Sequence, residues 1–197
     1  MNVANYMQKL FAIIHCAEVT DSAGKQMLLE EGVLQTVKVI SELNHYNRKL
    51  MFIGNGGSAA IASHEATDFL KNGKIRAMSL NEGSLLTCFS NDYGYENVFY
   101  EPLKLYADSG DLLFAISSSG KSLNILRGVE SARINQCKII TLSGFSRHNA
   151  LRKMGDINFF IPSYSYGFVE LAHQILLHMT LEIVMENNCR TLETIES

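Results

Sequence analysis

The sequence predicts an α/β fold in which helices cover both faces of a five-stranded parallel sheet, preceded by a helical N-terminal extension. Five short, uninterrupted apolar runs indicate strands that are buried on both faces. Between the runs, apolar residues recur at spacings of three and four, which is typical of the crossover helices of a parallel sheet. Two more stretches of this helical period precede the first run. With 197 residues, the chain is long enough for one such domain with a substantial core.

The elements follow one another in a regular order. The leading stretches, 4–20 and 26–46, are expected to be amphipathic helices that pack against another subunit. The apolar runs predict strands at 49–53, 76–80, 111–116, 138–142 and 157–161. The segments between them predict helices at 58–71, 83–106, 122–135 and 147–154, followed by a long final helix at 167–187. This last helix is rich in Leu, Ile, Val and Met, so we expect it to serve core packing and subunit contact.

Composition and charge narrow the class of protein. Apolar residues make up 47% of the chain and charged residues 19%, which is ordinary for a globular protein. The net charge of −3, without a basic arm, disfavours direct nucleic-acid binding. The N-terminus lacks a signal-peptide layout and no apolar run reaches about 18 residues, so we expect a cytoplasmic protein without a membrane segment. The widely spaced cysteines are expected to be buried free thiols: Cys16, Cys88, Cys137 and Cys189.

Two loops rich in glycine and serine follow expected strands. GNGGS (54–58) comes after the first strand and SSSGKS (117–122) after the third. In the flavodoxin-like strand order 2-1-3-4-5, strands 1 and 3 are neighbours, and ligands bind in the crevice where their connections diverge. Free N–H groups at the starts of the following helices, with the serine hydroxyl groups, suit a phosphate. Each loop alone could be a simple turn or helix cap, but two of them at adjacent strand ends favour a shared site.

A dinucleotide site is an alternative for the first loop. Gly54, Gly56 and Ala59 fit the G-x-G-x-x-A pattern after a strand, and Glu82 is a candidate for the acidic residue that binds the ribose. However, Glu82 stands about 28 residues after Gly54, whereas the usual spacing is about 20. A dinucleotide site also needs no serine-rich loop on its third strand, so a phosphate site is the better interpretation.

Four segments resemble the SIS (sugar isomerase) domain, and more closely the phosphoheptose isomerases: GNGGSAA (54–60), NDYGYENVF (91–99), DLLFAISSSGKS (111–122) and KIITLSG (138–144). The resemblance implies an aldose–ketose isomerase that converts sedoheptulose 7-phosphate to D-glycero-D-manno-heptose 7-phosphate. It also implies a homotetramer, with N-terminal helices (1–47) for oligomerisation and a sugar-phosphate-binding SIS domain (48–197). The same group contains the adaptor that binds the replication initiator DnaA, so a non-catalytic phosphosugar-binding or protein-binding role is the alternative.

The resemblance also implies the residues of the site. The expected substrate contacts are Asn55, Gly56, Gly57, Ser58, Asn91, Asp92, Ser117, Ser118, Ser119, Ser122 and Glu170. The expected ligands of one zinc ion per chain are His64, Asp68, Glu170 and His178. Asp68 is the implied base of the reaction and His178 the implied acid. An adaptor would have no need of this metal constellation.

Several of these positions can also be judged from the residues alone. His64 and Asp68 are four apart, share one helix face and can bind one metal. Glu170 and His178 lie about 12 Å apart along a helix and need side chains that lean together. Taken alone, each histidine fits a core or solvated residue, and His173 is expected in core or interface packing.

The sequence departs from the family pattern at two site positions. It has Asp68 where the family has glutamate and Glu170 where the family has glutamine. The family segment Arg-Ile-Gln-Glu reads Phe168-Val169-Glu170-Leu171.

Overall fold

The computed structural model describes the backbone of residues 2–195, with the side chains of that range apart from 44–45 and 189–195. The strands are β1 (Glu18–Asp21), β2 (Gln26–Met27), β3 (Leu50–Gly54), β4 (Ala77–Ser79), β5 (Leu112–Ser117), β6 (Lys138–Gly144) and β7 (Ile157–Ile161). The helices are α1 (Val3–His15), α2 (Leu29–His45), α3 (Gly57–Lys71), α4 (Gly83–Tyr93), α5 (Tyr100–Tyr106), α6 (Leu123–Ile134) and α7 (Tyr166–Ile195), with the short 3-10 helices η1 (Tyr95–Asn97) and η2 (Leu151–Lys153).

The predicted parallel sheet is present, with the predicted strand order. Strands β4, β3, β5, β6 and β7 are parallel and lie side by side in that sequence, which is the order 2-1-3-4-5 of the five expected strands. Gly54 at the end of β3 pairs with Ile116 near the end of β5. The loops after these two strands therefore leave the same edge of the sheet next to each other.

The number of strands was underpredicted, because the sheet has seven strands and not five. Strand β1 pairs antiparallel with β7, with Val19 opposite Phe159, and β2 pairs with β1. Both lie in segments expected to be helical, the end of 4–20 and the start of 26–46. The turn between them is fixed by the Asp21 carboxylate, which accepts the N–H groups of Ala23 and Lys25. Pairing with the free edge of β7 outweighs the helical period of these residues.

Two expected helices are shorter than predicted. The segment 83–106 divides into α4, η1 and α5, because Gly94, with φ of +82°, ends α4 in a conformation that other residues rarely adopt. The segment 147–154 contains only η2. Here the Asn149 side chain donates to the Ser146 carbonyl oxygen and accepts the Arg152 N–H, and these bonds replace those of an α-helix.

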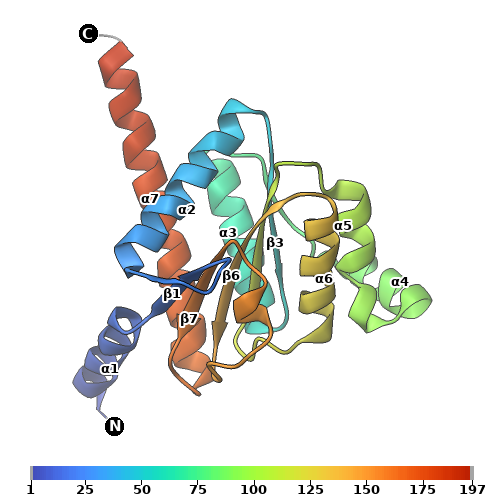
Figure 1. The fold of residues 1–197 in the computed structure, drawn as a ribbon, viewed down its shortest axis with the longest axis horizontal. Coiled ribbons are helices and arrows are strands. Elements are labelled where there is room, and N and C mark those ends of the chain that lie inside the picture. The colour runs from blue at the N-terminus through green and yellow to red at the C-terminus, as the bar shows by residue number, and fades with distance from the viewer. Residues whose placement is uncertain (1, 196–197) are drawn as a thin grey trace.

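The core lies in two layers, one on each face of the sheet. Along β5, Leu112, Phe114 and Ile116 pack with α2, α3 and α7, whereas Leu113 and Ala115 pack with α4, α5 and α6. Figure 1 shows these two groups of helices on opposite sides of the strands. Helices on both faces are therefore confirmed, and the sheet is buried between them.

Helix α7 is the longest element. By length and composition alone its Tyr166–Asn188 part could cross a membrane, and half of its most apolar stretch is buried inside the fold. The cysteine prediction is only partly right, since Cys137 is buried while Cys16 and Cys88 are exposed, and all three are free thiols. Burial raises the pKa of the Cys137 thiol to about 12. The side chain of Cys189 lies outside the described residues.

Candidate active site

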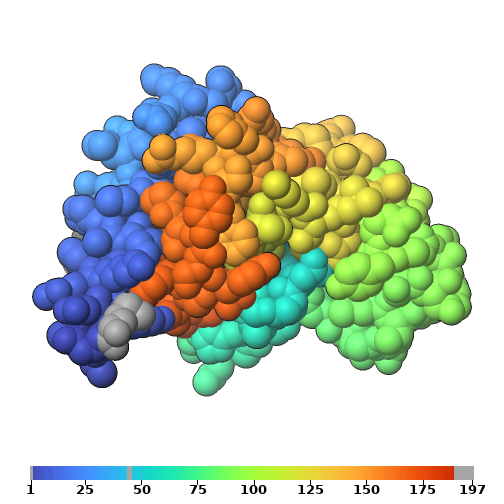
Figure 2. Space-filling view, turned by 90° about the horizontal axis from the view of Figure 1, so that it is seen from below, coloured from blue at the N-terminus to red at the C-terminus, as the bar shows by residue number. Residues whose placement is uncertain are grey.

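A pocket of about 250 Å³ opens where β3 and β5 end. It is lined by Asn55, Gly56, Gly57, Ser58, Ile116, Ser117, Ser118, Ser119, Ser122, Tyr166 and Glu170. All of these except Ile116 and Tyr166 are predicted substrate contacts. Figure 2 looks onto this edge of the sheet, where the 117–122 loop (yellow), the start of α3 (cyan) and the start of α7 (orange-red) meet. The two loops thus come together as the strand order requires.

The first loop brings the N-terminus of α3 to the pocket. Gly56, with φ of +54°, precedes the helix and has no side chain that could cap its first N–H groups. The first N–H groups of a helix have no partner within it, and the helix dipole adds positive potential there. Since Gly57 and Ser58 line the pocket, this end of α3 is suited to an anion such as a phosphate.

The second loop supplies hydroxyl groups in a fixed turn. The N–H of Gly120 donates to the Ser117 carbonyl oxygen at 3.0 Å and lies 3.2 Å from its Oγ. Gly120 has φ of +61°, and a Cβ there would collide with the Asn149 side chain, so only glycine fits. The Oγ of Ser118 is buried and has no hydrogen-bond partner among the described residues. A buried hydroxyl without a partner, beside a pocket, is available for a ligand.

A second group of side chains gathers further along α3 and α7. His64 Nε2 lies 3.4 Å from Asp68 Oδ2 and 3.3 Å from His178 Nε2. His178 Nδ1 lies 3.9 Å from Asp68 Oδ2. One ligand atom from each residue falls within 4.8 Å of the other two, and imidazole nitrogens with a carboxylate oxygen are the donors that zinc accepts. The donor set therefore fits a metal ion.

The structure adds a residue that sequence reasoning missed. Glu65 is fully buried, accepts a hydrogen bond from the Gln174 side chain and has its Oε1 3.5 Å from His178 Nε2. Burial, and secondarily the nearby Asp68, raises the pKa of Glu65 to about 8. The sequence does hold a signal, because Glu65 falls on the apolar stripe of α3 that includes Ile61 and Phe69. A carboxylate on such a stripe indicates a specific polar partner.

Glu170 lies apart from the metal donors. It lines the pocket, and its carboxylate lies against Gly57 at the start of α3, where a Cβ on that glycine would collide with it. Among the described residues, only three of the four expected zinc ligands come together. The spacing of eight residues between Glu170 and His178, about 12 Å along α7, explains the separation.

The remaining predicted positions lie on α4 or in the core. Asn91 and Asp92 are exposed on α4, where Asn91 donates to Asp92, and they do not line the pocket. Glu82, the acid considered for a dinucleotide site, caps α4 by accepting the Leu85 N–H. His173 is fully buried with its Nε2 3.2 Å from the Ser143 carbonyl oxygen, as core packing predicts.

The pocket and the metal donors are linked by two helices. Helix α3 runs from Gly57 at the pocket to His64, about 10 Å away by the helical rise. Helix α7 runs from Glu170 at the pocket to His178 over about 12 Å. An anion held in the pocket would therefore need a chain of several atoms to reach the imidazole and carboxylate groups.

Comparison with known proteins gives a family match and several named relatives. The SIS domain family matches residues 16–144. The phosphoheptose isomerase of Fusobacterium nucleatum is 32% identical over 163 residues, which cover 78% of this chain and 82% of the relative. The phosphoheptose isomerase of Helicobacter hepaticus is 32% identical over 174 residues, covering 85% and 88%. The solved structure of phosphoheptose isomerase GmhA from Neisseria gonorrhoeae shares the fold with a TM-score of 0.80 and 25% identity, covering 92% of this chain and 96% of that one.

These matches confirm the resemblance predicted from the loop motifs. The matched family segment contains the first loop, the serine loop, His64 and Asp68. The isomerase relatives extend the match over most of the chain. The chain therefore belongs to the SIS domain family and, within it, to the phosphoheptose isomerases.

Proposed function

We propose that this chain is an aldose–ketose isomerase that converts sedoheptulose 7-phosphate to D-glycero-D-manno-heptose 7-phosphate. The observation that carries the proposal is the pair of helices α3 and α7. Both begin at the pocket, and further along them His64, Asp68 and His178 come together, away from the pocket. A sugar phosphate has its anionic end and its reacting carbonyl end at opposite ends of one chain. The names of the relatives support the heptose.

The phosphate group would bind in the pocket. The start of α3 offers N–H groups, and the serine loop offers hydroxyl groups, of which Ser118 Oγ is buried without a partner. Each contact with a helix terminus contributes about 0.3–1 kcal/mol, so the affinity depends on several such groups acting together. Asn91 and Asp92 remain proposed contacts for the sugar hydroxyl groups from α4.

The isomerisation moves a hydrogen between two adjacent carbons. In our proposal the Asp68 carboxylate takes the proton from the carbon next to the carbonyl, which gives an enediol, and returns it to the neighbouring carbon. His178, which is half-buried and close to Asp68, moves the proton between the two oxygens. Asp68 and His178 are therefore the proposed base and acid.

The proposed cofactor is one zinc ion per chain, held by His64, Asp68 and His178. Such an ion would polarise the sugar carbonyl and stabilise negative charge on its oxygen. Glu170, the fourth ligand implied by the resemblance, lies at the pocket in this structure. In an assembled protein, a residue of another subunit could complete the ligand set.

An assay of purified protein tests the proposal directly. We expect turnover of sedoheptulose 7-phosphate, about one zinc ion per chain, and loss of both on treatment with a chelator. Asp68→Asn keeps the size of the side chain but removes the basic carboxylate, so it should abolish turnover with little change in substrate affinity. Metal-free protein without turnover would refute the enzyme and favour the adaptor role.

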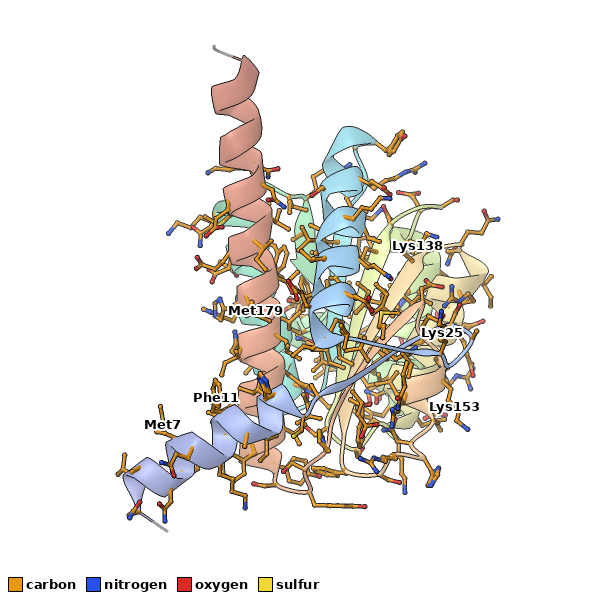
Figure 3. The ribbon with its side chains drawn as sticks, turned by 60° about the vertical axis from the view of Figure 1, so that its left-hand side comes forward. Met7, Phe11, Lys25, Lys138, Lys153 and Met179 are labelled. Carbon is orange, nitrogen blue, oxygen red and sulfur yellow. The ribbon has the colours of Figure 1, made fainter. Side chains whose placement is uncertain are left out.

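Assembly and location complete the proposal. Val3, Met7 and Phe11 form an exposed apolar stripe on α1, with 82%, 60% and 70% of their surfaces accessible. Helix α1 projects from the body of the fold beside α7 (Figures 1 and 3). We propose that this N-terminal segment (1–47) joins the chains of a homotetramer. Light scattering tests this proposal, and a mass of 22 kDa, that of a single chain, would contradict it. The free thiols of the described residues suit a reducing compartment, so we propose the cytoplasm.

A further inference from the structure

The side chain of Asn55, which lines the pocket, forms a closed pair with the side chain of Asn124. Asn55 Nδ2 donates to Asn124 Oδ1 at 2.9 Å, and Asn124 Nδ2 donates to Asn55 Oδ1 at 2.8 Å. Asn124 lies in the first turn of α6, directly after the serine loop, and only 2% of its surface is accessible. Two amide groups from separate loops thus bind each other beside the pocket.

The backbone of α6 decides which way round both amide groups lie. An asparagine amide has an acceptor oxygen and a donor nitrogen, and a half-turn of the group exchanges their places. The N–H of Ile125 can only donate and lies 3.0 Å from Asn124, so the atom that it faces has to be Oδ1. Asn124 then presents its nitrogen to Asn55, where only the oxygen of Asn55 can accept. A turned Asn55 amide would place nitrogen against nitrogen and oxygen against oxygen.

A third side chain, Tyr95 of η1, completes the arrangement. Its hydroxyl group donates to Asn55 Oδ1 at 3.0 Å, so this oxygen accepts two hydrogen bonds, one from Tyr95 and one from Asn124. The Asn55 nitrogen carries two hydrogens, of which one is bound to Asn124. The other has no acceptor among the described residues. Because Asn55 lines the pocket, this second N–H is available to a ligand there.

The charge of the ligand makes the orientation of this amide important. Phosphate oxygens are strong hydrogen-bond acceptors, so an N–H group attracts them, whereas an amide oxygen in its place would repel them. We propose that Asn124, assisted by Tyr95, is a positioning residue that holds the Asn55 amide with its nitrogen at the pocket, so that Asn55 donates a hydrogen bond to the bound phosphate. The inference rests on the proposed binding of a phosphate group in this pocket. It gives a role to two residues that do not themselves line it.

Binding of inorganic phosphate tests the proposal without turnover. Asn124→Leu keeps the volume of the side chain but removes both amide atoms, while the N–H of Ile125 keeps a second acceptor, the Ser122 carbonyl oxygen. The Asn55 amide is then free to turn. The dissociation constant of phosphate, measured by isothermal titration calorimetry, should therefore rise about 3–10-fold.

A matched control and a double variant separate positioning from a merely structural role. Asn135→Leu is the same change at the other end of α6, where the amide binds two backbone carbonyl groups, and it should leave phosphate binding unchanged. Asn55→Ala should itself raise the dissociation constant about 10-fold. If Asn124 acts through Asn55, adding Asn124→Leu to Asn55→Ala should cause no further rise.

Three results would overturn the proposal: an unchanged constant in Asn124→Leu, an equal rise in Asn135→Leu, or a further rise in the double variant. Native protein that binds no phosphate would overturn it as well. Phosphate binding with the expected effects, in a protein that does not turn over sedoheptulose 7-phosphate, would refute the isomerase function alone.

A second variant covers the case in which Asn124→Leu does not fold. Tyr95→Phe removes only a hydroxyl group from a side chain that is 54% exposed, so the fold should be kept. It should raise the dissociation constant of phosphate about 2–3-fold in the native protein and leave that of Asn55→Ala unchanged. Tyr93→Phe, the same change at an equally exposed tyrosine of α4, is its control. No rise in Tyr95→Phe, or an equal rise in Tyr93→Phe, would count against the proposal.

Discussion

The buried histidine of α7 makes the stability of the protein depend on pH in a defined way. Burial lowers the pKa of His173 from 6.5 to about 4, although the hydrogen bond to Ser143 acts in the opposite direction. As the pH falls, the unfolded chain therefore binds a proton before the folded one does. Stability that is present above pH 6.5 is lost as the pH falls toward 4. The substitution His173→Gln removes the titrating group and leaves an amide that can still donate to Ser143.

The size of the effect follows from the two pKa values. Between pH 7 and pH 5 they correspond to a loss of about 2 kcal/mol in the free energy of unfolding of the native protein. With a urea m-value of about 2 kcal/mol/M, the unfolding midpoint moves by about 1 M. Glu65 acts in the opposite direction, because its pKa is raised to about 8 in the folded protein, so its contribution grows as the pH falls. The pH dependence of unfolding of the native protein alone therefore does not isolate the effect of His173.

The assay compares urea unfolding of native protein and His173→Gln at both pH values, followed by circular dichroism at one protein concentration without metal. Glu65 is present in both proteins and cancels in the difference. We expect the variant to gain about 2 kcal/mol relative to the native protein on going to pH 5. His148→Gln, the same change at an exposed histidine, serves as the control. A difference between His173→Gln and native protein that stays constant from pH 7 to pH 5 would refute the reasoning.

Four other changes have defined outcomes. Ser119→Ala removes a hydroxyl from the pocket and should raise KM for the sugar phosphate several-fold in steady-state kinetics. Glu170→Gln removes a negative charge from the same pocket and should lower KM by about 2–5-fold, and a higher KM would show that Glu170 does not oppose the phosphate. Gly120→Ala should reduce the free energy of unfolding by about 1–3 kcal/mol in urea melts, because φ is +61° and the Asn149 side chain fills the space. Phe11→Glu should lower the mass measured by light scattering without changing the circular dichroism spectrum, since the ring is exposed on α1.

Most of the parallel sheet could be predicted because its strands carry their signal locally. In the run at 157–161 every residue is buried, and the four apolar residues around Asn158 give its limits without further information. The hairpin at 18–27 could not be predicted in this way. Val19 is a strand residue because Phe159, far away in the chain, offers an unpaired edge, and no local pattern contains that partner.

The site divides in the same manner. The two pocket loops could be predicted from their composition and from the strand order, since glycine and serine allow the tight turns that these loops make. Glu65 was not predicted because its contacts are with Gln174 and His178, which belong to another helix. The placement of Glu170 beside Gly57 likewise depends on how α7 packs against α3. The sequence spacing along α7 does not determine that packing.

The two short border strands of the sheet have a consequence for how copies of the protein can meet. Strand β2 has two residues and β4 has three, so neither border offers a row of free backbone groups long enough to pair with a foreign strand. Without the hairpin, the five-residue β7 would be such a border. The hairpin therefore protects the chain from open-ended, fibre-like stacking, and it leaves association to the helices, where it can stop at a closed number of copies.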